Sequence, residues 1–254
     1  MTPPFLTAGL AAPHGFFTRA GGVSSGRFAA LNCSLSGRDD AAAVAVNRAR
    51  AADALGLPAT ALLGLTQVHG IAVTEATEPW GADARPVADA MVTDRPGLLL
   101  GIVTGDCAPV LFLDAEAGVA GAAHAGWRGA VAGVMEATIA AMERLGAKRA
   151  RIAAAVGPCI GQASYEVGPD LREAVLAAGA GDEGFFAPGK REDRWQFDLP
   201  GYCVARLRAT GVASARWIGQ DTLAEETHFF SHRRSTLAGG GPIGHQLSAI
   251  AIPR

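Results

Sequence analysis

Short apolar runs that end at polar residues constrain the fold of this 254-residue chain more than any other feature. The runs are rich in Val, Leu and Ile and are bounded by Gly or Asp, a pattern typical of buried β-strands. All of them are far shorter than the ~20 apolar residues that a membrane-spanning helix requires. We predict strands over residues 62–68, 71–74, 98–104, 110–113, 119–123, 151–156, 215–218 and 247–252.

Helical patterns lie between these runs. Asp39 and Asp40 can cap a helix over residues 41–55, which Gly56 and Pro58 end. Further helices are predicted over residues 129–145, 169–178 and 199–210, and an exposed loop over residues 184–194.

The order of these elements predicts the fold class. Strands and helices are interspersed, and the gap at residues 114–118 has the length of a hairpin turn. This favours an α+β fold with mixed β-sheets layered with helices over a purely parallel, doubly wound sheet. Since no repeat, linker or low-complexity tract divides the chain, we expect a single domain over residues 1–254.

The charge balance argues against a polyanionic partner. Lys and Arg number 22 and Asp and Glu 24, so the formal charge is -2 and the basic excess of a nucleic-acid-binding protein is missing. Apart from Lys148 and Lys190, the basic residues are all arginines, which bind phosphate and carboxylate groups in a bidentate manner. We therefore expect small anionic ligands, and neither nucleic acid nor a membrane as partner.

The cysteine content and the first residues predict a cytoplasmic location. Four cysteines in a chain of this length are too few for a disulfide scaffold. The first residues lack the basic and apolar regions of a signal peptide.

Three polar clusters follow predicted strands, at residues 66–70, 104–109 and 124–129. His69, Cys107 and His124 from these clusters supply two imidazole nitrogens and one thiolate, a donor set that suits zinc and leaves a fourth position open. The separations match no local zinc-finger spacing. On spacing alone, core histidines and an inert buried cysteine are the alternative to a metal site.

Other segments could bind a ligand. Gly126 and Gly129 place Trp127 and Arg128 at the start of a helix, where backbone N–H groups favour an anion, although a solvent-facing Arg is the simpler alternative. Residues 157–168 form another strand-to-loop junction that carries Tyr and Glu. Residues 229–234 combine two Phe, one His and two Arg that could stack a flat ring or hold an anion.

The order and spacing of these motifs resemble those of one known family. It is the laccase-domain family, also called the purine nucleoside phosphorylase or polyphenol oxidase family, which includes the peptidoglycan editing factor. The resemblance runs from about residue 13 to residue 252. The matching segments are residues 14–24, 31–32, 47–48, 67–70, 105–111, 123–129, 157–161, 165–168 and 230–234.

The resemblance implies an α/β/β/α-like domain with a zinc ion bound by His69, Cys107 and His124. It also implies zinc-dependent phosphorolysis of adenosine, inosine, guanosine and methylthioadenosine, and deamination of adenosine. Copper is the alternative metal.

For these reactions we assign roles from side-chain chemistry. Asp106 is the candidate proton carrier for deamination, or else a carboxylate that caps its loop or orients a metal-bound His. Arg128, aided by Arg48 or Arg19, is the candidate ligand of orthophosphate. Further candidate substrate contacts are Gln67, Tyr165 and Arg233.

The sequence departs from the family pattern at three places. Asp221-Thr222 stands where Cys-Thr is usual, and Ser231-His232-Arg233-Arg234 stands where Ser-Tyr-Arg-Arg is usual. Residues 240–246 replace a usual Gly-Arg before the last strand. We expect the altered segment to line the substrate pocket and to affect base preference.

Three other functions remain as alternatives. The first is a peptidoglycan editing amidase that removes a wrong amino acid from a muramyl precursor, and the second is a copper-dependent polyphenol oxidase. Six histidines with one clear His/Cys/His set cannot furnish a full multicopper assembly. The third is a binding protein in which zinc only stabilises the fold, which a three-ligand site disfavours. The sequence carries no signal for an oligomeric state.

Overall fold

The structure is a computed structural model that describes residues 3–36, 38–179 and 182–252. The helices are α1 (Ala41–Ala54), α2 (Trp127–Ala132), α3 (Val134–Arg144), α4 (Pro169–Ala178), α5 (Leu199–Ala209) and α6 (His232–Leu237). The strands are β1 (Phe5–Leu6), β2 (His14–Phe17), β3 (Val73–Glu75), β4 (Ala90–Thr93), β5 (Leu99–Thr104), β6 (Ala108–Asp114), β7 (Val119–Ala125), β8 (Ala153–Val156), β9 (Glu166–Val167), β10 (Phe186–Pro188), β11 (Trp195–Phe197), β12 (Ser214–Trp217) and β13 (Gln246–Ala251).

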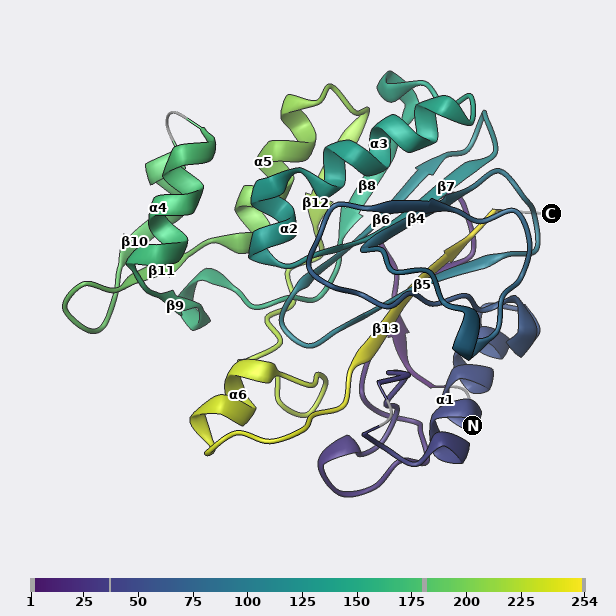
Figure 1. Ribbon diagram of the computed structural model, residues 1–254, viewed down its shortest axis with the longest axis horizontal. Helices are drawn as coiled ribbons and strands as arrows, with labels where there is room; N and C mark the ends of the chain where they lie inside the picture. Colours follow the sequence, from purple (N-terminus) through teal and green to yellow (C-terminus); the bar gives the residue numbers. More distant parts are fainter. Residues whose placement is uncertain (1–2, 37, 180–181, 253–254) are drawn as a thin grey trace.

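Two sheets packed between helices form the body of the molecule (Figure 1). The larger sheet has the order β12-β8-β6-β7-β4-β3, and α2, α3 and α5 cover one of its faces. The second sheet has the order β1-β2-β13-β5 and packs between the larger sheet and α1. A small sheet, β10-β11-β9, lies beside α4 at one side of the molecule. The predicted mixed α+β architecture in layers is confirmed.

Alternation along β6 explains why these strands are apolar on both faces. Val110 and Phe112 pack toward the helices, whereas Leu111 and Leu113 pack against the second sheet. Because successive side chains of a strand point to opposite faces, a strand between two apolar layers needs apolar residues at every position. The apolar runs of the sequence are therefore the central strands of a layered core.

Three predicted elements are wrong in detail. Residues 62–68 form only isolated bridges, because the side-chain amide of Gln67 takes the place of strand pairing: it donates to Val103 O at 2.8 Å and accepts from Val103 N at 3.0 Å. The helix predicted over residues 129–145 is two helices, broken at Gly133, whose φ is 101°. The loop predicted over residues 184–194 contains β10, which pairs with β11 in antiparallel fashion.

Cys33, Cys107, Cys159 and Cys203 are free thiols. Within the described ranges, no helix combines the length and the apolar character that a membrane crossing requires.

Candidate functional site

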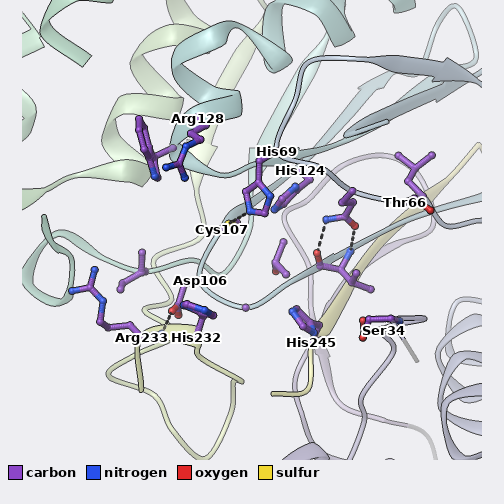
Figure 2. A pocket seen from close by; sticks show the side chains of 18 of the residues that line it. Ser34, Thr66, His69, Asp106, Cys107, His124, Arg128, His232, Arg233 and His245 are labelled. Carbon is purple, nitrogen blue, oxygen red and sulfur yellow. Dashed lines mark hydrogen bonds between the residues drawn. The ribbon is translucent and has the colours of Figure 1, made fainter. Parts of the chain in front are cut away.

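A cavity of about 540 Å³ opens at the ends of β5, β6 and β7 (Figure 2). Three of its lining residues are arginines and one is a carboxylate. Its size and its mixture of aromatic and polar groups suit a small molecule. The lining residues are Ser34, Leu35, Ser36, Leu65, Thr66, Gln67, His69, Arg85, Val103, Thr104, Gly105, Asp106, Cys107, His124, Trp127, Arg128, Ile160, Tyr165, Leu199, His232, Arg233 and His245.

His69, Cys107 and His124 meet in this cavity. Antiparallel pairing of β6 with β7 places Pro109 opposite His124, which brings the preceding Cys107 beside the imidazole. Cys107 Sγ lies 3.8 Å from His69 Nε2, and one donor atom from each of the three residues lies within 4.8 Å of the others. His69 has a φ of 62°, an uncommon conformation for a residue with a side chain, of the kind that clusters at functional sites.

Asp89 orients two of these three residues, although the sequence analysis did not identify it. Its buried carboxylate accepts hydrogen bonds from the backbone N–H groups of Val68, His69 and Gly70. It also lies 2.8 Å from His124 Nδ1, which leaves Nε2 of that ring to face the other two donors. Burial alone would raise the pKa of Asp89, but the hydrogen bonds from His124 and Gly70 outweigh it and lower the pKa. The only sequence signal was one Asp inside an apolar run.

The pKa values of Cys107 and His124 describe the protonation of the cluster before a metal binds. Burial raises the pKa of the Cys107 thiol, but the neighbouring His124 and His69 outweigh burial and lower the pKa to about 6. The thiolate, which is the form that binds metals, is therefore favoured at neutral pH. Burial lowers the pKa of His124, and Cys107 and Asp89 raise it to about 9, so the ring holds a second proton at neutral pH that a metal ion would displace. Two imidazoles and a thiolate, one ring being fixed by a carboxylate, fit a zinc or copper ion.

A glycine gives the cluster its room. A Cβ atom on Gly126 would lie 2.9 Å from His69 Cδ2 and 3.0 Å from Cys107 Sγ. Real Cβ atoms essentially never come within 3.0 Å of another group, so a side chain at Gly126 would push His69 away and crowd Cys107.

Asp106 lines the same cavity, but its carboxylate is hydrogen-bonded to other parts of the chain. Its carboxylate accepts hydrogen bonds from Thr222 Oγ1 at 2.6 Å, from Ser231 Oγ at 3.0 Å and from the backbone N–H of Arg233 at 2.6 Å. It therefore ties the start of α6 to the loop before β6. This geometry favours the expected alternative, a capping carboxylate, over a proton carrier. Thr222, Ser231 and Arg233 all belong to segments in which the sequence departs from the family pattern.

Four other predicted residues reach the cavity in different ways. Arg128 is exposed, and its Cζ lies 4.3 Å from the centre of the Trp127 ring. Arg233 lies over the Tyr165 ring at 5.3 Å and donates from Nη1 to the carbonyl of residue 166. Burial raises the pKa of Tyr165. The side-chain amide of Gln67 forms two hydrogen bonds with the backbone of Val103. Gln67 therefore lines the cavity without offering a free hydrogen-bonding group.

The structure does not bring Arg19 and Arg48 into this cavity. Arg19 donates from Nε and Nη2 to Ala29 O and lies over the ring of Phe230. Arg48 donates to the carbonyls of Cys33, Leu62 and Leu63. Both guanidinium groups bind backbone carbonyls of irregular segments, a role that the motifs alone could not distinguish from ligand binding.

Two other residues line the cavity: Arg85, which no sequence pattern indicated, and His245, which was expected there only as part of the altered segment. Arg85 follows a stretch without periodicity, and His245 stands in the segment that replaces the usual Gly-Arg. Burial, and then the charges at His124 and His232, lower the pKa of His245 to about 4, so its ring is neutral at pH 7. The expectation that the altered segment lines the pocket agrees with the place of His232 and His245.

Known proteins resemble this chain over nearly its whole length. A purine nucleoside phosphorylase from Deinococcus radiodurans is 45% identical over 99% of this chain and 94% of its own. One from Streptomyces griseus is 43% identical over 88% of this chain and 89% of its own. The crystal structure of a DUF152-family protein from Neisseria meningitidis superposes with a TM-score of 0.87 at 34% identity, covering 98% of this chain and 99% of that one.

YlmD from Geobacillus stearothermophilus superposes with a TM-score of 0.84 at 30% identity, covering 99% of this chain and all of that one. The family model described as multi-copper polyphenol oxidoreductase laccase matches residues 13–253. Together with the layered fold and the order of the motifs around the cavity, these matches show that the chain belongs to that laccase-like, DUF152 family.

Proposed function

We propose that this protein is a zinc-dependent purine nucleoside phosphorylase. The observation that carries the proposal is the cluster of His69, Cys107 and His124, preorganised by Asp89 inside a cavity whose charged lining is mostly arginine. The names of the relatives from Deinococcus and Streptomyces support the same activity.

His69, Cys107 and His124 would hold the zinc ion. Zinc bound there would supply Lewis-acid polarisation of a substrate oxygen and activation of water. The remaining side chains bind and orient the substrates. Trp127 and Tyr165 offer aromatic faces to a purine, and the arginines favour an anionic co-substrate.

In the proposed reaction, a phosphate oxygen forms a bond to C1′ of the ribose as the bond from C1′ to N9 breaks. The electron pair of that bond leaves with the purine, which takes up a proton and departs as the free base. The protein contributes by holding the nucleoside and the phosphate in line, which converts a bimolecular encounter into a reaction between positioned groups. We propose adenosine, inosine, guanosine and methylthioadenosine as the nucleosides.

Deamination of adenosine is the second reaction that we propose for this cavity. Water replaces the amino group at C6, and ammonia leaves. The observation that favours it is the three-donor cluster, since three protein ligands leave a coordination position open. Asp106 enters this proposal as the carboxylate that positions Arg233 and α6.

Two rival functions have distinct chemistry. Oxidation of phenols by several copper ions is the activity in the name of the family model, but the described residues contain one cluster of three donors. Hydrolysis of an amide in a muramyl precursor would use the same cluster and the same arginines. Release of an amino acid without any action on nucleosides would favour the amidase, and several copper ions per chain would favour the oxidase.

Chromatography of the products from adenosine and inosine, with and without phosphate, tests the proposal. We expect free base only when phosphate is present, and inosine from adenosine in either case. Cys107→Ser, which changes one donor atom, should abolish both. Unchanged nucleosides with the zinc-loaded parent would overturn the proposal.

A further inference from the structure

We infer that one end of the cavity, formed by Ser34, Ser36, Arg85 and His245, is the binding site of inorganic phosphate. The inference rests on the proposed phosphorolysis and assigns its second substrate to named residues. We call these four residues the phosphate end.

Hydrogen bonds to the segment at residues 32–36 hold this end together. Arg85 donates from Nη1 to Leu35 O at 3.2 Å. His245 donates its backbone N–H to Asn32 Oδ1 at 2.9 Å and accepts from the backbone N–H of Cys33 at 3.1 Å. Arg85 and His245 are therefore both bonded to one short segment, and Figure 2 shows the His245 ring near Ser34.

The guanidinium group of Arg85 has unused binding capacity. Of its donors, Nη1 is bonded to Leu35, and Nε is buried without a hydrogen-bond partner in the described part of the chain. Among the described residues, it forms no ion pair with a carboxylate. A partly buried cation without an acidic partner is costly unless an anion binds to it.

Arg48 adds a second positive charge behind this end. It lies close enough for the charge of Arg85 to lower its pKa, after the larger effects of burial and of Cys33. Its donors bind the carbonyls of residues 33, 62 and 63, and no carboxylate of the described ranges pairs with it. Arg48 therefore contributes charge without touching the ligand, while Arg85 lines the cavity and touches it.

Neutral polar groups complete the site. His245 Nδ1 and Thr104 Oγ1 are buried, and neither has a hydrogen-bond partner within the described residues. Thr104 stands opposite Gln246 in the pairing of β5 with β13, next to His245. The hydroxyl groups of Ser34 and Ser36 line the same end. Arginine, imidazole and hydroxyl groups gathered without a free carboxylate match the oxygens of a phosphate.

The other end of the cavity differs in a way that supports this assignment. It is lined by Trp127, Tyr165 and Leu199, whose apolar faces suit a purine. The two arginines at that end lie over the rings of Trp127 and Tyr165. In Figure 2 the cluster of His69, Cys107 and His124 lies between Arg128 on one side and Ser34 on the other. Since the base leaves C1′ on the side opposite to the entering phosphate, phosphorolysis needs two unlike ends of this kind.

Binding of inorganic phosphate to the zinc-loaded protein, measured by titration calorimetry, tests the inference. Arg85→Gln should weaken phosphate binding about tenfold or more, since hydrogen bonds to charged groups contribute on that scale. The same variant should raise KM for phosphate and leave KM for inosine within about twofold. Arg85→Lys, which keeps the charge but loses the fork of donors, should fall between the parent and Arg85→Gln.

Two matched variants make the result decisive. Arg144→Gln, in the last turn of α3, removes an exposed arginine far from the cavity and should bind phosphate like the parent. Arg128→Gln removes one of the two arginines at the other end. Loss of phosphate binding in Arg128→Gln with normal binding in Arg85→Gln and Arg85→Lys would overturn the inference, as would a parent that does not bind phosphate. A parent that binds phosphate through Arg85 but releases no base would instead contradict the proposed function and leave the site standing.

Discussion

Two buried aspartates near the cavity, Asp89 and Asp106, hold different parts of the chain together. Asp89 joins groups that adjacent strands already bring together, namely the N–H groups of residues 68–70 and the ring of His124. Asp106 instead binds Thr222, Ser231 and Arg233, more than a hundred residues further along the chain.

This difference divides the cavity into two walls, one with the three proposed metal ligands and one for the proposed substrates. The wall that carries the three proposed metal ligands is attached to the larger sheet, since His124 lies in β7 and Asp89 binds both His124 and the loop of His69. The wall that we propose for substrate binding includes a C-terminal segment that Asp106 ties to the loop before β6, and that segment is where the sequence departs from the family pattern. A change of substrate preference can therefore occur there without disturbing the metal ligands.

Among the variants that distinguish the roles of Asp89 and Asp106, the largest change in zinc affinity is expected for Asp89→Asn. The amide keeps the shape but presents an N–H group to neighbours that already donate, so His124 and the loop of His69 lose their orientation. We expect zinc affinity to fall about 10–100-fold, and activity with it. A competition titration with a chromophoric chelator measures the affinity. Unchanged zinc binding would contradict the role given to Asp89.

The next largest change in zinc affinity is expected for Gly126→Ala, which crowds the proposed metal ligands without replacing any of them. The new methyl group would collide with His69 and Cys107 and should weaken zinc binding about tenfold, because the donors must move from their preorganised positions. Gly184→Ala is the matched control, since its Cβ would meet no atom within 4 Å. Equal zinc affinity in the two variants would refute the crowding argument.

A smaller and different effect is expected for Asp106→Asn. The variant should bind zinc like the parent while KM for the nucleoside rises several-fold, because α6 and Arg233 lose the group that positions them. Hydrogen exchange should become faster at residues 231–237. If zinc binding falls as far as in Asp89→Asn, the two walls are not independent.

The smallest effect on function is expected at Asp114, a buried carboxylate at the other end of β6. Burial raises its pKa, but hydrogen bonds from the N–H groups of Lys148 and Ala117 and from Arg151 outweigh burial and lower it. Asp114→Asn should leave zinc binding and kinetics intact while lowering the free energy of unfolding by about 1–2 kcal/mol.

The pH dependence of that loss follows from the sign of the shift. A carboxyl group with a lowered folded-state pKa stabilises the fold fully above its unfolded pKa of about 4, and loses that contribution as the pH falls further. The difference in stability between the parent and Asp114→Asn should therefore be constant near neutral pH and shrink below about pH 4. Denaturant unfolding at several pH values measures it. A difference that grows in acid would contradict the sign.

The residues of the proposed metal site were easier to identify from the sequence than those of the substrate-binding wall, for a physical reason. Cys107 follows β5 and His124 lies near the end of β7, two strands whose apolar runs are readable, and the pairing of β6 with β7 brings these two residues together. His69 follows an apolar run that forms only isolated bridges. Asp89 was missed because its role depends on which strands become neighbours, and β4 pairs with β7 through a register that composition does not encode.

The substrate wall depends on irregular segments whose contacts are side chain to backbone. Arg85 and His245 meet through hydrogen bonds to residues 32–35, and such bonds leave no periodic signal. For the same reason Arg19 and Arg48 could be taken for ligand-binding residues, although both bind carbonyl groups. Gln67 was predicted as a substrate contact and instead continues the pairing of β5.

We propose that one metal ion at His69, Cys107 and His124 supports phosphorolysis. The decisive experiment titrates chelator-stripped protein with zinc and follows base release from inosine and phosphate at each addition. We expect no activity without metal, a linear rise that ends at about one zinc per chain, and no rise for Cys107→Ser. Full activity in the stripped protein, or activity that appears only with several copper ions per chain, would contradict it.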